Sequence, residues 1–355
     1  MNKKFHKKLN ELGKLSGYQK PIKVNDVLKL DSNENLAIKK EFQTELIREA
    51  QKRCDVRTYP LGGVENLINS LAKYLKVPKN MISVGNGSDQ ILDLILATLS
   101  TKTTKILTSD PPFGFFEERF KLYSITRIKI PFSKYMDLQI EDFIKKAKSV
   151  DMIYLDSPNN PSGFQFSNKQ LERLFKSFPG PIIIDEAYGE FSNSTVLNLV
   201  KKYPNVILVK TLSKAFGLAG LRIGYMIADK KFTEIFSNVI QYPYPLNSLA
   251  IECGILAIEK SKQIVSIFET IKKQRTRIIQ NLRKYDAFDV FDSSANFVLF
   301  DAKGADTRVY NALIEQGISI RKLGKLGSHK GCLRVTVGTS EMNSKFLLAI
   351  RDLIE

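Results

Sequence analysis

Short apolar, β-branched runs alternate with helical patterns between residues 81 and 225, and each run ends in a loop of small and polar residues. Runs of this kind are typical of buried strands. Alternating strands and helices predict an α/β fold with a mainly parallel, doubly wound sheet. Because ligands of such sheets bind at the edge where the strands end, we expect the functional residues in the loops that follow the apolar runs.

The composition is that of an ordinary globular protein, with 43% hydrophobic and 26% charged residues, and 355 residues suggest two domains. The basic start is not followed by an apolar signal region, and no apolar run reaches membrane-spanning length. We therefore expect a cytoplasmic protein. Three cysteines far apart and two histidines leave little material for a disulfide framework, a metal centre or a Ser/His triad.

The formal net charge of +17 admits nucleic acid, an acidic membrane surface or anionic small molecules as partners. The lysines are spread over surface-helix patterns, and a dense block occurs only in the N-terminal tail. Diffuse charge favours solubility or the steering of anionic substrates. A nucleic-acid-binding module stays a minor alternative, which salt-dependent binding to mixed-sequence DNA would reveal.

The loop after the apolar run 205–209 combines one lysine with small and hydroxyl-bearing residues. Lys214 follows Thr211 and Ser213, precedes three glycines, and stands eight residues before Arg222. Small residues let the backbone approach a ligand, hydroxyls and arginine suit a phosphate, and a lysine can form an imine with a carbonyl. Each residue taken alone also fits a solvated loop.

A second apolar run leads directly into Asp185, which places this carboxylate at the C-terminal end of a buried strand. Its desolvation is costly unless a cation pairs with it. Acids at such a place also bind metals in some ATPase strands. That alternative requires a GxxxxGK[ST] phosphate loop, and the sequence has none.

Two more strand-end loops carry candidate binding groups. The turn with Gly87, Ser88 and Asp89 opens a helix, whose unpaired N–H groups and positive dipole end favour an anion, although Ser88 or Asp89 could simply cap the helix. Gln90 stands where a dinucleotide fingerprint needs glycine or alanine, which disfavours a dehydrogenase. Asn160 offers an amide donor without added charge, although its Asn-Pro-Ser-Gly loop could be an ordinary turn.

These elements together resemble the fold-type I pyridoxal-phosphate (PLP) aminotransferases, most closely the histidinol-phosphate aminotransferase group. The matching motifs are Ser-Lys-x-x-Gly-x-x-Gly-x-Arg-x-Gly, Asp-Glu-Ala-Tyr, Asn-Pro-x-Gly and Gly-x-Gly-Ser-Asp, and they occur in the family's order. The resemblance implies a large PLP-binding domain at 41–248, a smaller α/β domain at 249–355, and an N-terminal segment 1–40 that packs with the smaller domain. It also implies a homodimer with shared active sites.

The resemblance assigns a role to each cofactor residue. Lys214 would hold PLP covalently and move a proton at the substrate α-carbon, Asp185 would keep the pyridine nitrogen protonated, and Tyr188 and Asn160 would contact the ring oxygen. Phe113 would stack on the ring, with Phe116 as second choice. Within the same subunit, the phosphate would be bound by the amides around Gly87, Ser88 and Asp89 and by Thr211, Ser213 and Arg222. The partner subunit would contribute Tyr59.

The resemblance also suggests substrate contacts. Arg334, in Leu-Arg-x-Thr-x-Gly, would bind a substrate carboxylate, although an arginine within an alternating strand could equally lie at the surface. Arg321 and Tyr18 would face a distal phosphate. Asn33 belongs to an Asn-Glu-Asn segment that is similar to the family's, except that Leu36 replaces the usual proline.

The implied reaction is transamination between histidinol phosphate and 2-oxoglutarate, a step of histidine biosynthesis, without a metal ion. An aminotransferase for aromatic or other amino acids is an alternative. A PLP decarboxylase of the same fold, acting on a phosphorylated amino acid, would share all the cofactor residues. Specificity rests on a few pocket residues without a readable code.

Overall fold

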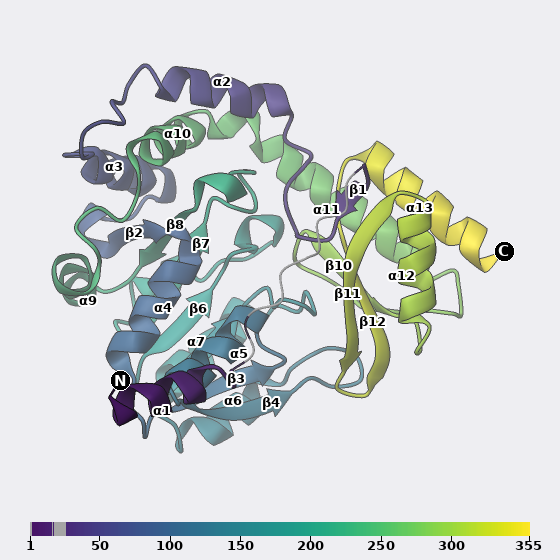
Figure 1. Ribbon diagram of the computed structural model, residues 1–355, viewed down its shortest axis with the longest axis horizontal. Helices are drawn as coiled ribbons and strands as arrows, with labels where there is room; N and C mark the ends of the chain where they lie inside the picture. The colour runs from purple at the N-terminus through teal and green to yellow at the C-terminus, as the bar shows by residue number, and fades with distance from the viewer. Residues whose placement is uncertain (1, 16, 18–25) are drawn as a thin grey trace.

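A seven-stranded sheet forms the centre of the larger part of the molecule, and a five-stranded sheet forms the smaller part (Figure 1). The computed structural model describes residues 2–15, 17 and 26–355. No helix in these ranges is both long and apolar enough to cross a membrane.

The large sheet has the strand order β2-β8-β7-β6-β5-β3-β4, and all of its strands except β8 run in one direction. Its strands are β2 (Ile82–Asn86), β3 (Lys105–Asp110), β4 (Thr126–Pro131), β5 (Met152–Asp156), β6 (Ile182–Asp185), β7 (Val206–Thr211) and β8 (Ile223–Ile227). The predicted mainly parallel sheet is therefore confirmed. Strand β8 is antiparallel to β7 because the loop between them starts at the end of β7 and enters β8 at the same edge of the sheet.

Helices cover both faces of this sheet. They are α2 (Lys40–Ala50), α3 (Gly63–Leu75), α4 (Gly87–Leu99), α5 (Gly114–Leu122), α6 (Ile140–Ala147), α7 (Asn168–Ser177), α8 (Leu197–Val200), α9 (Lys230–Ile235) and α10 (Ser248–Glu259). Side chains alternate along each strand, so Ile183 packs in the cluster of α4 and α5 while Ile182 and Ile184 belong to the core on the other face. Asp185, two residues after Ile183, therefore points to the α4 side.

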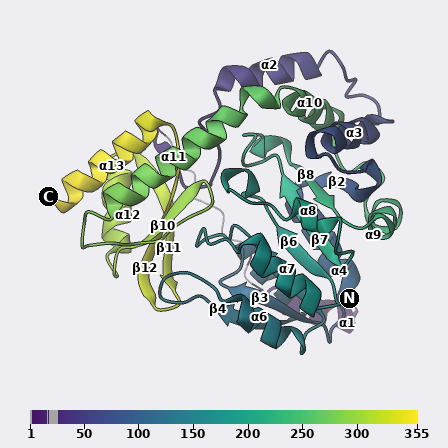
Figure 2. The same cartoon turned by 180° about the vertical axis from the view of Figure 1, so that it is seen from behind.

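The small sheet has the order β1-β11-β12-β10-β9 and is antiparallel except where β1 pairs with β11. Its strands are β1 (Leu28–Leu30), β9 (Asp289–Val290), β10 (Phe297–Asp301), β11 (Ile318–Leu326) and β12 (His329–Thr336), and its helices are α11 (Val265–Leu282), α12 (Asp306–Glu315) and α13 (Ser340–Ile354). Within the predicted N-terminal segment, β1 thus joins the small sheet. Helix α1 (Lys3–Leu12), which has no buried residue, instead lies away from the small sheet in both views (Figures 1 and 2).

The predicted long helix from 249 to 285 is two helices, α10 and α11, separated by a short 3₁₀ turn at 261–263. The linker contains neither glycine nor proline, so the sequence pattern gave no break signal. Helix α10 packs against α2 and α3, whereas α11 runs toward the small sheet (Figure 2). Helix α10, which the prediction assigns to the smaller domain, thus contacts helices of the larger part.

Candidate active site

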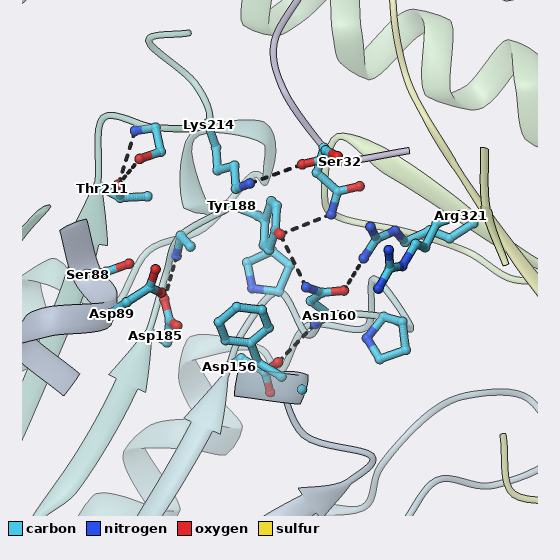
Figure 3. A pocket seen from close by; sticks show the side chains of 18 of the residues that line it. Ser32, Ser88, Asp89, Asp156, Asn160, Asp185, Tyr188, Thr211, Lys214 and Arg321 are labelled. Carbon is cyan, nitrogen blue, oxygen red and sulfur yellow. Dashed lines mark hydrogen bonds between the residues drawn. The ribbon is translucent and has the colours of Figure 1, made fainter. Parts of the chain in front are cut away.

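A cavity of about 570 Å³ opens at the carboxyl edge of β5, β6 and β7, where the large and small sheets approach each other (Figure 3). Segment 31–34 and strands β11 and β12 complete its wall. The predicted site residues that line it are Asn33, Ser88, Asp89, Phe113, Asn160, Asp185, Tyr188, Thr211, Ser213, Lys214, Arg222, Arg321 and Arg334. The structure thus brings together most of the residues that the sequence analysis selected.

Lys214 lies half-buried in the loop between β7 and β8 and points into the cavity (Figure 3). Its Nζ donates to the backbone oxygen of Ser32 at 3.2 Å and lies 5.8 Å from the centre of the Tyr188 ring. Burial, followed by the positive charge of Arg334, lowers the pKa of Lys214 to about 8. About a tenth of this amine is therefore neutral, and nucleophilic, at pH 7, a far larger share than for an ordinary lysine.

The loop around Lys214 is held in place by the N-terminal segment. Asn35 donates through Nδ2 to the backbone oxygen of Ala215 at 2.8 Å, and Gln43 donates to the oxygen of Gly217 at 2.6 Å. Asn35 is buried, so the path of the Asn-Glu-Asn segment is fixed by contacts other than the missing proline, while Leu36 remains partly exposed.

Asp185 ends β6 and is only 5% exposed. Its oxygens accept from the backbone N–H of Ala187 at 2.9 Å and from the hydroxyl of Tyr154 at 3.2 Å. Burial, and next the charge of Asp156, raise the pKa of Asp185 to about 7. Among the described residues no lysine or arginine forms an ion pair with this carboxylate. The site therefore favours a ligand that brings a cation to Asp185.

The turn between β2 and α4 forms an anion-binding cup. Gly87 has φ +78°, and a Cβ at this position would lie 2.4 Å from Nη2 of Arg222, so glycine permits the guanidinium to approach the turn. Arg222 also binds the Asp89 carboxylate at 2.8 Å and contacts the Ser213 hydroxyl at 3.5 Å. Thr211 donates to that hydroxyl at 2.9 Å. N–H groups at the start of α4, a hydroxyl and a guanidinium suit a phosphate.

The capping alternative for this turn finds no support. The side chain before the helix makes no capping hydrogen bond, and the Asp89 carboxylate binds Arg222 instead.

Tyr188 and Asn160 meet on the far wall of the cavity. The Tyr188 hydroxyl accepts from Nδ2 of Asn33 at 3.0 Å and from Nδ2 of Asn160 at 3.4 Å. Arg334 donates to Oδ1 of Asn160 and, at 3.0 Å, to the backbone oxygen of Asp31. Arg334 is buried, so its strand position faces the cavity and not the molecular surface.

Two arginines are directly opposite each other in the small sheet. Arg321 of β11 and Arg334 of β12 are partners in the antiparallel register, so both side chains project from the same face, and both line the cavity. Like charges in this arrangement repel each other, and an anion between them removes the repulsion.

Of the aromatic candidates Phe113, Phe116 and Tyr59, only Phe113 lines the cavity of its own chain. Phe113 lines the cavity, whereas Phe116 is buried in the core and stacks on Tyr154 with ring centres 3.9 Å apart. Tyr59 does not line the cavity of its own chain; it is 70% exposed and stacks on Tyr244 at 4.5 Å. Tyr18 lies outside the described residues.

The cavity also contains residues that the sequence analysis did not select. Asp156 ends the apolar run of β5 just as Asp185 ends that of β6, so the same signal was available. Ser32 and Glu34 flank Asn33 in the sequence and line the cavity with it. Leu323 and Leu326 of β11 give no chemical signal.

Comparisons of the sequence with known proteins identify aminotransferases. Residues 25–350 match the family model described as aminotransferase class I and II. The histidinol-phosphate aminotransferase of Thermoanaerobacter pseudethanolicus is 32% identical over 330 residues, which cover 92% of this chain and 93% of that protein.

Two solved structures have the same fold. The histidinol-phosphate aminotransferase from Clostridium acetobutylicum has a TM-score of 0.84 and 27% identity, covering 92% of this chain and 99% of the other. The histidinol-phosphate aminotransferase from Sinorhizobium meliloti in complex with pyridoxal-5'-phosphate has a TM-score of 0.82 at 21% identity, with 92% and 91% covered. At that identity the second likeness concerns the fold alone.

Proposed function

The chain belongs to the aminotransferase class I and II family and is a PLP-dependent transaminase, and we propose that it transfers the amino group of histidinol phosphate to 2-oxoglutarate. The observation that supports these two substrates is the opposed pair Arg321 and Arg334. A phosphate monoester and a dicarboxylate each carry a net charge of about −2. Each can therefore lie beside two guanidinium groups.

The donor set of the cavity fits PLP. Asp185 is a buried carboxylate without a cationic partner in the described part of the chain, which matches a protonated ring nitrogen. Ser213, Arg222 and the N–H groups that open α4 match a phosphate, and Phe113 offers an aromatic face. Lys214 supplies the amine that would bond to an aldehyde carbon.

When bound, PLP accepts the electron pair that remains at the substrate α-carbon after a proton leaves. Lys214, with its lowered pKa, would remove that proton from the amino donor and, in the second half of the reaction, would deliver a proton to the α-carbon of the new amino acid. Asp185 would keep the ring nitrogen protonated, and Asn160 and Tyr188, which lie 3.4 Å apart, would donate to a ring oxygen. Arg334 binds a substrate carboxylate and orients the α-carbon toward Lys214.

A homodimer would complete this site. Tyr59 and Tyr244 stack on each other and bring together two surface segments that also carry Val56, Leu61 and Val239, and these five side chains are 44–81% exposed. Exposed apolar groups that lie together favour an interface. In a dimer, Tyr59 of each subunit would reach the phosphate cup of its partner.

Product analysis tests the proposal. Purified protein with PLP should convert 2-oxoglutarate to glutamate when histidinol phosphate is the amino donor, and phenylalanine or tyrosine should be poor donors. Release of CO2 from a phosphorylated amino acid, without glutamate, would instead identify a decarboxylase. A preference for an unphosphorylated donor would contradict the assignment to histidinol phosphate.

A further inference from the structure

A second acid lies beside Asp185 on the floor of the cavity. Asp156 and Asp185 are partners in the parallel register of β5 and β6, so their side chains project from the same face at the same sheet edge (Figure 3). Both are buried, Asp156 at 8% exposure, and both line the cavity.

The hydrogen bonds of Asp156 connect it to the Asn160 loop. Its Oδ1 accepts from Nδ2 of Asn159 at 2.8 Å, and its Oδ2 accepts from the backbone N–H of Asn160 at 3.0 Å. The side chain of Asn160 in turn contacts Tyr188 and Arg334. Asp156 therefore fixes the loop from which the amide of Asn160 projects.

The charge of Asp156 has no counter-ion from the protein within the described ranges. Its acceptor oxygens are bound by neutral amides, and burial raises its pKa only to about 6. Near neutral pH this carboxylate is therefore mainly ionised, and it is the largest charge that raises the pKa of Asp185. Asp156 thus places a negative charge beside Asp185, and a cation bound at this floor would offset it.

We propose that Asp156 is a positioning residue that holds the Asn160 loop and adds a second negative charge, so that the site selects a ligand with a cationic ring nitrogen. The inference rests on the proposed function, because the cation concerned is the protonated ring nitrogen of PLP. Asp156 acts through Asp185 and Asn160.

A pair of ligands separates the effect of charge from that of the loop. We would measure the affinity of the cofactor-free protein for PLP and for 1-deazapyridoxal 5'-phosphate, in which a C–H group replaces the ring nitrogen. Asp156→Asn should lower the preference for PLP over this analogue about tenfold or more. This is the effect expected from removing one negative charge near the ring nitrogen in a partly polar site. If that variant does not fold, Asp156→Ser, which keeps an oxygen acceptor, serves the same comparison.

Ser162→Ala is the matched control, because it removes a 2.7 Å hydrogen bond to Asn159 in the same loop without changing any charge. It should affect both ligands equally. An unchanged preference in the Asp156 variant, or an equal loss of preference in the control, would overturn the inference while the wild-type protein still bound PLP. A wild-type protein that bound neither ligand would overturn the proposed function, and this inference with it.

Discussion

Replacing Asp185 with asparagine should make the cofactor-free protein more stable near pH 8. The pKa of this carboxyl is 3.8 in an ordinary setting and about 7 in the fold. Between these values the folded protein retains a proton that the unfolded chain has released, so the free energy of unfolding falls as the pH rises from about 4 to about 7. Asparagine removes this loss, because it has no charge to bury.

The size of the effect follows from the two pKa values. A pKa difference of about 3 corresponds to about 4 kcal/mol above pH 7, and to about 1.5 kcal/mol near pH 5. The amide oxygen can still accept from Ala187, and the Tyr154 hydroxyl can accept from the new amide instead of donating. Imperfect geometry of these bonds reduces the gain, and we expect about 2 to 4 kcal/mol near pH 8.

Urea unfolding followed by circular dichroism measures this gain at about pH 5 and about pH 8, with both proteins at one concentration. Asp286→Asn, at an exposed acid, is the control and should change stability little at either pH. Saturating PLP should reverse the order, because only the wild-type carboxylate pairs with the ring cation. A gain that does not grow with pH, or a loss near pH 8, would refute the reasoning about this buried charge.

Three further changes test the site. Lys214→Ala should abolish transamination and the visible absorbance of bound cofactor while circular dichroism shows a persisting fold, and any retained turnover would contradict its role. Arg321→Ala should lower kcat/KM for histidinol phosphate about ten- to a hundredfold and leave kcat/KM for aromatic amino acids much less affected. Arg308→Ala, at an exposed position of α12, is the control and should change neither value much. Equal losses on both substrates would argue against a phosphate contact. Tyr59→Phe should weaken PLP binding about fivefold in a protein that sedimentation shows to be dimeric, and an active monomer would contradict the shared site.

The strand ends were predictable because buried strands produce apolar runs whose last residues are chemically conspicuous. Lys214, Asp185 and Asn160 were found in this way, and the cavity brings them together. Other features depend on contacts distant in sequence. The pairing of Arg321 with Arg334 depends on the register of a hairpin that contains irregularities, and the break between α10 and α11 depends on which helices lie against each.

Two positive side chains held opposite each other also have a practical meaning for anyone who handles this protein. We expect inorganic phosphate or sulfate to bind between the register partners Arg321 and Arg334. An anion that binds only the folded state stabilises it by about 2.7 kcal/mol at a hundredfold excess over its Kd. The same anion would compete with substrate. Phosphate buffer would then preserve the protein during purification and depress its measured activity, whereas an assay in a buffer of weakly binding anions would report the unhindered enzyme.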